Sequence, residues 1–513
     1  MGRMKNFKRI MMLLLLIILL PVVVFADGNV AKVNGTEYDT IEKAMTAAEG
    51  TEYEVVLLQD VTLAKTKVVT KDLAIDLNGH SIKYTSLLFE VYGAEFTVKG
   101  TGTLEETTPD YTPIAVYGSK DNDENFKSVV NVGEGVTLKG WSGIMVREYG
   151  KYSQKTEASN NSYGVEVNFA GKIISVLDTG NGTGSGIYVN GNIKHIENAP
   201  VVNIKKTADI TSMGVGILIA GYANVTVEGG KIVGDESGIE VRAGELVVLD
   251  GTIESTATKL EVKPNNNGST TIGAGIAVAQ HTTVNKLNVE VKGGNISGHV
   301  AFNEANPENN TPQEVEEIQL DISGGNFETT NTASDAKAVA SETQTEFVKG
   351  GKYNAALSET LIIASATTKV ENGIVKVLKE NKVNVEDSKN GTVKVDKNIA
   401  LEGDTVTITA TPEKGYEIDK IVVEDVQGKS ITVTDGKFTM GEYEVGVIVT
   451  FKKVEDKKED TIVSKPTDKT EETPKIPETP KTSDNILVNV SLGLISIGGI
   501  VLALNELKKR KYN

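Results

Sequence analysis

The chain has 513 residues, no cysteine and a formal net charge of −17. The lack of cysteine excludes a disulfide framework and thiolate chemistry, and the acidity argues against nucleic acid as a partner, because phosphate binding needs a basic face. Only five arginines occur, three of them near the termini, so a site that clamps anions with several guanidinium groups is not expected.

The first 26 residues have the parts of a secretory signal peptide. Four basic residues precede an apolar run from Met11 to Phe25, and Val24 and Ala26 are small at the two positions that a signal peptidase inspects. We therefore expect residues 1–26 to be a signal peptide, cleaved between Ala26 and Asp27. The alternative is an uncleaved membrane anchor, for which the apolar run is short.

A short amphipathic helix is expected after Thr40, whose hydroxyl can cap the helix start. Ile41, Ala44, Met45 and Ala48 recur at helical spacing and fall on one face. The pattern predicts a helix that covers an apolar surface with this face.

Two short motifs recur through the body of the chain. The first is an alternating strand that ends in Gly-Gly or Asp-Gly, with an apolar residue two positions later; its last glycine is Gly230, Gly251, Gly294, Gly325 and Gly351. The second is Gly-Ile-x-Val/Ile, which begins at Gly143, Gly186, Gly216, Gly238 and Gly275. The second follows the first after a short turn, with no helix-period stretch between them, so the repeating unit is strand, turn, strand.

This repeat predicts a solenoid of short parallel strands. Alternate side chains point inward, where Ile and Val stack on the same residue type one coil away, and glycine occupies the sharp turns. A unit of roughly 21–26 residues, doubled where a copy has decayed, predicts about 12–15 coils over residues 28–378. The alternative is a β-sandwich or barrel, which also has short strands at regular spacing.

At these residues the chain resembles the right-handed parallel β-helix proteins of pectate-lyase-like architecture, and among them the adhesin-like members on Gram-positive surfaces. The resemblance implies an all-β chain with a right-handed parallel β-helix over residues 27–380. It also implies that the helix beginning at Ile41 plugs the open first coil. Because such β-helices often carry polysaccharide lyases or glycosidases, the resemblance raises the question of catalysis.

A smaller all-β module is expected over residues 381–453. Apolar and polar residues alternate there, as in Val406 and Ile408 and again in Val447 and Val449. The module resembles the internalin-type B-repeat, which serves as a stalk unit in bacterial surface proteins.

The rest of the chain divides into four parts by composition: a Pro/Thr/Lys/Glu linker at 454–479, a polar segment at 480–485, an apolar run at 486–504 and a basic tail at 505–513. The linker should be extended and solvated. The apolar run is long enough for a transmembrane helix, and the basic tail should remain in the cytoplasm.

This order of parts resembles the cell-wall sorting signal of Gram-positive surface proteins, whose pattern is Leu-Pro-x-Thr-Gly before an apolar span and a basic tail. Pro480, Lys481 and Thr482 match the core of that pattern, whereas Thr479 and Ser483 replace its Leu and Gly. The resemblance implies that a sortase attacks the Thr482 carbonyl and joins the protein to cell-wall peptidoglycan. The alternative is a single-pass membrane protein with an extracellular N-terminal region.

No residue pattern singles out a catalytic centre. Glycoside hydrolysis needs two carboxylates at a set separation, but in so acidic a chain no pair stands out. Arg147 and Arg242 each follow a Gly-Ile-x-Val strand, so they could lie beside a binding groove or form ordinary surface ion pairs. Trp141 and Tyr152 could stack on a sugar or pack in a core.

No metal site or cofactor is expected either. The four histidines share no ligand spacing: His80, His195, His281 and His299. The segment from Asp121 to Asn125 begins like a calcium loop, but it lacks the glycine and the final acid that such a loop needs.

The leading hypothesis is therefore a secreted, cell-wall-anchored surface protein without catalysis, an adhesin or other binding module displayed on a β-helix. Its ligand would be an extracellular protein or polysaccharide. A second hypothesis is a wall-attached polysaccharide lyase or glycoside hydrolase that uses a groove on the same β-helix. A structural spacer without a ligand is the third.

Overall fold

The computed structural model describes residues 28–108, 110–121, 123–148, 161–176, 184–193, 196–264, 270–332 and 337–455. The predicted signal peptide with its cleavage site at Ala26 and Asp27 lies outside the described residues. So do the sorting-signal residues Pro480, Lys481, Thr482 and Ser483, the apolar run at 486–504 and the basic tail. In the described part of the chain, no helix is both long and apolar enough to cross a membrane.

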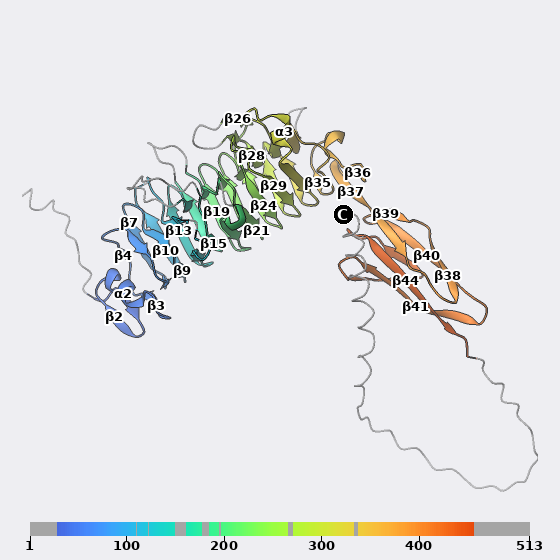
Figure 1. The fold of residues 1–513 in the computed structure, drawn as a ribbon, viewed down its shortest axis with the longest axis horizontal. Helices are drawn as coiled ribbons and strands as arrows, with labels where there is room; N and C mark the ends of the chain where they lie inside the picture. Colours follow the sequence, from blue (N-terminus) through green and yellow to red (C-terminus); the bar gives the residue numbers. More distant parts are fainter. Residues whose placement is uncertain are drawn as a thin grey trace, which may run out of the picture. The chain divides into compact units, whose positions relative to one another are not determined.

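The strands from β3 to β34 wind in successive coils (Figure 1). Apart from the hairpin strands β26 and β27, each coil gives one strand to each of three sheets. Sheet A contains β1 (Ala31–Val33), β2 (Thr36–Tyr38), β3 (Glu54–Leu57), β6 (Leu73–Asp76), β9 (Glu95–Lys99), β12 (Ser128–Val132), β15 (Val165–Phe169), β18 (Val201–Ile204), β21 (Asn224–Val227), β24 (Gly244–Val248), β29 (Leu287–Val291) and β32 (Ile318–Ile322). Sheet B contains β4 (Val61–Thr62), β7 (Ser81–Tyr84), β10 (Gly102–Glu106), β13 (Val136–Gly140), β16 (Lys172–Ser175), β19 (Asp209–Ser212), β22 (Lys231–Gly234), β25 (Thr252–Ser255), β30 (Asn295–Gly298), β33 (Asn326–Thr329) and β35 (Lys352–Tyr353). Sheet C contains β5 (Lys67–Val69), β8 (Phe89–Tyr92), β11 (Ile114–Tyr117), β14 (Ile144–Arg147), β17 (Ile187–Val189), β20 (Ile217–Ile219), β23 (Ile239–Val241), β28 (Ala274–Val278), β31 (Val300–Glu304) and β34 (Val339–Ser341).

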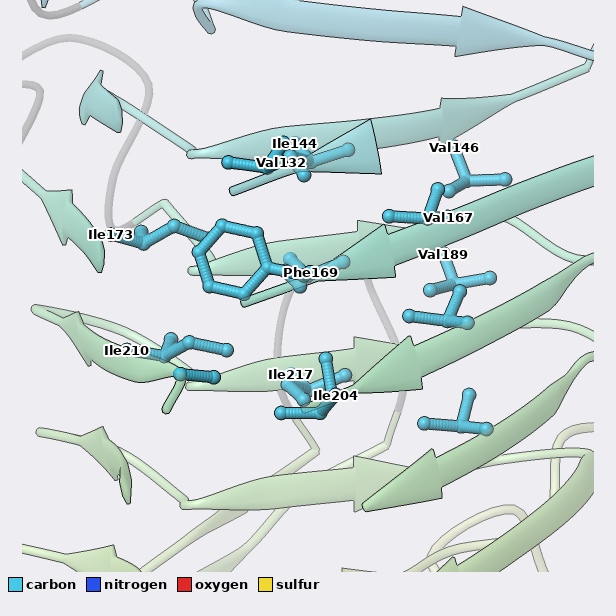
Figure 2. Close-up of a cluster of buried hydrophobic side chains, with 14 of the residues drawn as sticks. Val132, Ile144, Val146, Val167, Phe169, Ile173, Val189, Ile204, Ile210 and Ile217 are labelled. Atoms are coloured by element: carbon cyan, nitrogen blue, oxygen red, sulfur yellow. The ribbon is translucent and has the colours of Figure 1, made fainter. Parts of the chain in front are cut away.

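The core consists of columns of identical or similar side chains, one from each coil. Ile187, Ile217 and Ile239 pair in parallel register on sheet C, and all three are fully buried. Figure 2 shows inward side chains from the three sheets meeting between the strands: Val132, Ile144, Val146, Val167, Phe169, Ile173, Val189, Ile204, Ile210 and Ile217. The predicted parallel solenoid is therefore confirmed, and a sandwich or an up-and-down barrel is excluded for these residues. Its right-handed sense stays a prediction.

The glycine of the Gly-Ile motif is required by the close approach of consecutive coils. A Cβ atom on Gly186 would lie 2.5 Å from the carbonyl oxygen of Gly216, and one on Gly216 would lie 2.4 Å from that of Gly238. Any side chain here would push the coils apart and break the parallel pairing of the next strands.

Sheet C has ten strands among the described residues, where 12–15 coils were expected, and parallel pairs of Ile322 with Val348 and of Val348 with Ile362 continue the stack beyond β32. The longest spacing in the repeat is one coil with a long insertion, not two coils of which one has decayed. Between β25 and β28 the chain forms a hairpin of β26 (Glu261–Val262) and β27 (Thr271–Ile272). Val248 nevertheless pairs directly with Val291, so the insertion leaves the coil register intact.

The helix expected near the start is present as α2 (Ile41–Ala48). The Oγ1 atom of Thr40 accepts a hydrogen bond from the backbone N–H of Lys43 (3.4 Å), and the four apolar residues of one face are buried. The helix contacts β1, β2 and β3 at the start of the solenoid. That it plugs the open first coil stays a prediction.

Antiparallel strands lie at the outer edges of two sheets. β1 pairs antiparallel with β3, the first solenoid strand of sheet A. At the other end, β37 (Ile374–Val385) pairs antiparallel with β35 of sheet B and with β36 (Ala366–Glu371). The remaining helical segments lie in loops: the 3-10 helices η1 (Ile196–Asn198) and η2 (Glu359–Leu361), and α3 (Pro312–Val315).

The second half of β37 belongs to the smaller β module. It pairs with two strands of that module, β39 and β44. The module contains β38 (Gly391–Val395), β39 (Ile399–Leu401), β40 (Thr405–Pro412), β41 (Tyr416–Asp425), β42 (Ser430–Ile431), β43 (Lys437–Thr439) and β44 (Val445–Lys453). The predicted inward residues, Val406, Ile408, Val447 and Val449, are buried in a hydrophobic cluster of its own, distinct from that of the solenoid.

Candidate functional site

The outer face of sheet C presents a regular array of side chains. On β14 the side chains of Ile144 and Val146 are buried in the core, so Met145 and Arg147 face outward. The parallel register places Met145 beside Ala115 and Arg147 beside Tyr117. Strands β11 and β14 therefore each contribute two outward residues to two adjacent rows.

A hollow of about 290 Å³ opens on this face over the early coils. Strands β8, β11 and β14 line it with Glu90, Tyr117 and Arg147. The segments that lead into β11 and β14 add the side chains of Tyr111 and Trp141. Asp110 and Met145 are among the other lining residues. Aromatic, acidic and basic groups from three coils thus meet in one place.

The buried carboxylate of Glu106 fixes the position of the segment that carries Tyr111. Glu106, at the end of β10, is 3% exposed. One of its oxygens accepts hydrogen bonds from the backbone N–H and the hydroxyl of Thr108, both at 2.6 Å, and the other accepts from the N–H of Tyr111 (3.4 Å). The carbonyl of Tyr111 in turn accepts from the N–H of Trp141 (2.8 Å). These bonds hold the two aromatic residues at adjacent levels of the solenoid.

The Trp141 backbone is fixed from the following coil as well. Its carbonyl oxygen accepts a hydrogen bond from the hydroxyl of Ser175 (2.8 Å). Gly184 passes so close that a Cβ atom on it would lie 1.6 Å from the same oxygen. Only glycine fits this position, so the segment that carries Trp141 has little freedom to move.

The electrostatic character of the hollow is acidic. Glu90 and Asp110 line it, and Glu148 follows the lining residue Arg147. Burial, and next the charge of Glu90, raise the pKa of the Tyr117 hydroxyl, whereas the Arg147 guanidinium lowers it. Tyr117 is therefore a neutral hydrogen-bonding group at physiological pH.

Glu148 is only partly satisfied. Its Oε1 atom lies 3.5 Å from Nη2 of Arg147. Its Oε2 atom is buried and has no hydrogen-bond partner in the structure as described.

Arg147 and Arg242 follow the same sequence motif but have different surroundings in the structure. Arg147 lines the hollow, but Arg242 is 4% exposed and its Nε donates to Glu240 (2.7 Å), which is fully buried. Glu240 also accepts from the N–H and hydroxyl of Thr270 and from the N–H of Thr271. The alternative of an ordinary surface ion pair is therefore wrong for Arg242, because the β26–β27 insertion supplies groups that bind its partner.

Of the other sequence candidates, Trp141 lines the hollow, whereas Tyr152 and His195 are outside the described residues. His80 lies in a turn beside Asp60, with Nδ1 3.6 Å from Oδ1. Burial, and next the charge of Arg242, lower the pKa of His281 below its usual value.

The ring of His299 lies 3.1 Å from the side-chain amide of Asn331. In the segment that resembles the start of a calcium loop, the N–H of Asn125 donates a hydrogen bond to Oδ1 of Asp123 (2.9 Å). This bond forms a local turn. Among the residues that the structure describes, no cluster of three or more His, Cys, Asp or Glu side chains could hold a metal ion.

Sequence reasoning missed Glu90, Asp110 and Tyr111. Glu90 could have been found, because it occupies the outward position of an apolar-x-apolar strand on the same sheet as Arg147. Asp110 and Tyr111 belong to a turn without a motif, and this turn is held by the bonds of Glu106 to Thr108 and Tyr111 and by the bond of the Tyr111 carbonyl to the N–H of Trp141.

The chain is therefore a parallel β-helix protein with an appended β module. Residues 381–455 match the family described as the divergent InlB B-repeat domain, so the predicted similarity of this module to the internalin-type B-repeat is confirmed. Among solved structures, the crystal structure of the Dettilon tailspike protein matches with 11% identity over 74% of this chain and 87% of that chain, at a TM-score of 0.20. A similarity this low carries no argument about function. No curated protein sequence matches the chain.

Proposed function

We propose that this chain is a secreted, cell-wall-anchored surface protein that binds an extracellular carbohydrate on sheet C without catalysis. The observation that carries the proposal is the hollow that combines Tyr111 and Trp141 with Glu90 and Arg147. Sugar rings have apolar faces that pack on aromatic side chains and hydroxyl edges that bond to charged groups, and binding sites combine these two kinds of lining.

Surface display is supported by the two ends of the chain and by the B-repeat module. The sequence resembles a signal peptide cleaved between Ala26 and Asp27 and a sorting signal around Thr482. The match over residues 381–455 supplies a module of the kind that the resemblance associates with stalks. In this proposal the partners are a sortase and peptidoglycan, the β-helix is right-handed, and α2 closes its first coil.

The binding proposal is tested by intrinsic fluorescence, because Trp141 is the one tryptophan of the full sequence. Oligosaccharides of neutral, acidic and amino sugars are titrated into residues 27–482, and calorimetry checks the affinities. We expect a saturable change in emission, and Tyr111→Ala should weaken binding about tenfold, or about 1.4 kcal/mol. Tyr443→Ala, at an exposed position of the B-repeat module, is the control. No response to any sugar would refute carbohydrate binding at the hollow.

Anchoring is tested by fractionating cells that express the full chain. Thr482→Ala should move the protein from the wall fraction to the membrane or the medium, because the sorting resemblance makes the Thr482 carbonyl the point of sortase attack. Lys481→Ala, at the variable position of the pattern, should leave the wall fraction unchanged. Equal wall fractions for wild type and Thr482→Ala would rule out covalent anchoring at this residue.

A glycoside hydrolase or polysaccharide lyase is the second candidate, because two carboxylic acids, Glu90 and Asp110, line the same hollow. Hydrolysis of glycosides uses such a pair. Release of reducing ends or unsaturated uronates by the wild type, abolished in Glu90→Gln and Asp110→Asn, would establish catalysis in place of simple binding.

A further inference from the structure

The charge of the hollow restricts the class of sugar that it can bind. Glu90 and Asp110 line it and Glu148 lies next to it, against the single positive charge of Arg147 within this set. Tyr117 is 6% exposed, whereas Tyr111 is 38% exposed and Asp110 is exposed, so the hollow is partly open to solvent. An anionic sugar entering here would meet a net negative field, which solvent screens at the open side.

The carboxylates that line the hollow favour a ligand that donates hydrogen bonds. Asp110 is exposed, so a ligand can reach it. A carboxylate oxygen accepts hydrogen bonds and cannot donate them, and a positively charged donor forms the stronger bond with it.

We propose that the hollow binds oligosaccharides with unblocked amino groups, such as β-linked glucosamine, in preference to N-acetylated or uronic acid oligomers. This inference rests on the proposed carbohydrate binding and specifies its ligand. The sugar face packs on Trp141 and Tyr111, and the ammonium group donates to the carboxylates around the hollow. The net charge of −23 on residues 27–482 attracts such cationic chains over longer distances.

The test compares three probes on residues 27–482 by tryptophan fluorescence and calorimetry: a glucosamine oligomer, the N-acetylglucosamine oligomer of the same length, and oligogalacturonate. We expect the glucosamine oligomer to bind about tenfold more tightly than the acetylated one. Its affinity should fall as salt is added, because screening weakens charge attraction. Oligogalacturonate should bind most weakly.

Three variants distinguish an effect of charge on sugar affinity from an effect of local unfolding. Asp110→Asn and Glu90→Gln should lower the affinity for the glucosamine oligomer several-fold and leave the acetylated oligomer almost unaffected. Arg147→Gln should raise the affinity for the glucosamine oligomer, an effect that local unfolding would not produce. Glu254→Gln, which removes one negative charge from the outer face of sheet B, is the matched control.

The outcomes distinguish this inference from the proposal on which it rests. Equal affinity for the acetylated and the free amine oligomers, or tighter binding of oligogalacturonate, would overturn the preference for amino sugars and leave carbohydrate binding intact. No binding of any of the three probes would overturn both.

Discussion

Single side chains of the solenoid are stabilised by contact with their counterparts one coil away. Ile210 of β19 points into the core and is fully buried, whereas its neighbour Thr211 is exposed. In register with Ile173 and Ile232, Ile210 is one level of a continuous apolar column. The free energy of each level therefore depends on its neighbours above and below.

Replacing Ile210 by Asp should lower the free energy of unfolding by more than about 4 kcal/mol, because it buries a charge without a partner. Thr211→Asp places the same group on the outer face one residue away and should change stability by less than about 0.5 kcal/mol. Urea unfolding followed by circular dichroism measures both. Similar losses for the two variants would contradict the assigned inward and outward faces.

The buried pair of Glu240 and Arg242 gives a second prediction for single residues. Glu240→Ala leaves the Arg242 guanidinium buried without its 2.7 Å partner and should cost about 3–5 kcal/mol. The double variant Glu240→Leu with Arg242→Met removes both charges and should recover much of that loss. A double variant as unstable as Glu240→Ala would show that the carboxylate acts chiefly through Thr270 and Thr271.

Among the elements, the β36–β37 hairpin contains the carboxyl group with a strongly lowered pKa, so its stability should respond to acid. Hydrogen bonds from Lys369 and then Lys376 lower the pKa of Glu371 from 4.5 to about 2. A carboxyl group whose pKa is lowered by folding stabilises the folded form above its unfolded pKa, and this stabilisation is lost as the pH falls toward the folded value.

The hairpin should therefore weaken between about pH 4.5 and pH 2, and Glu371→Gln should remove this part of the pH dependence. Hydrogen exchange of the β36 amides across this range measures the effect. Because all three side chains are accessible to solvent, high salt should reduce it. An unchanged acid response in Glu371→Gln would assign the transition to other groups.

The elements differ in how far the sequence predicts them. The helix α2 was predicted with its cap because Thr40 and the spacing of Ile41, Ala44 and Met45 are local signals. The strands were predicted because inward residues repeat with each coil. The interpretation of the longest spacing as two coils was wrong, since an insertion such as the β26–β27 hairpin leaves the strand pairing unchanged and is therefore invisible in the repeat.

The hollow could be predicted only in part. Trp141 and Arg147 drew attention as residue types, but nothing in the sequence brings them to Glu90 or Tyr111. Those residues meet because the coil register sets β8, β11 and β14 side by side and because a buried Glu106 holds a turn. Such contacts depend on loop conformation, which has no period to detect.

On the scale of the whole molecule, the solenoid and the B-repeat module have separate hydrophobic clusters. We expect two unfolding transitions in calorimetry. Phe438→Ala in the module and Phe169→Ala in the solenoid should each cost about 3–5 kcal/mol, and each should move one transition only. A single transition shifted by both variants would show that β37, which belongs to both parts, couples them into one cooperative unit.

The antiparallel strands β1 and β37 have a consequence for the behaviour of the protein at high concentration. A stack of parallel strands ends in unpaired N–H and C=O groups, which could template the addition of another copy and lead to fibres. On sheet A that first edge is occupied by β1, and on sheet B the last is occupied by β37. The chain thus covers the ends of two parallel stacks with its own backbone, and the edge that remains on sheet A is the three-residue strand β2, too short to be a good template for another copy.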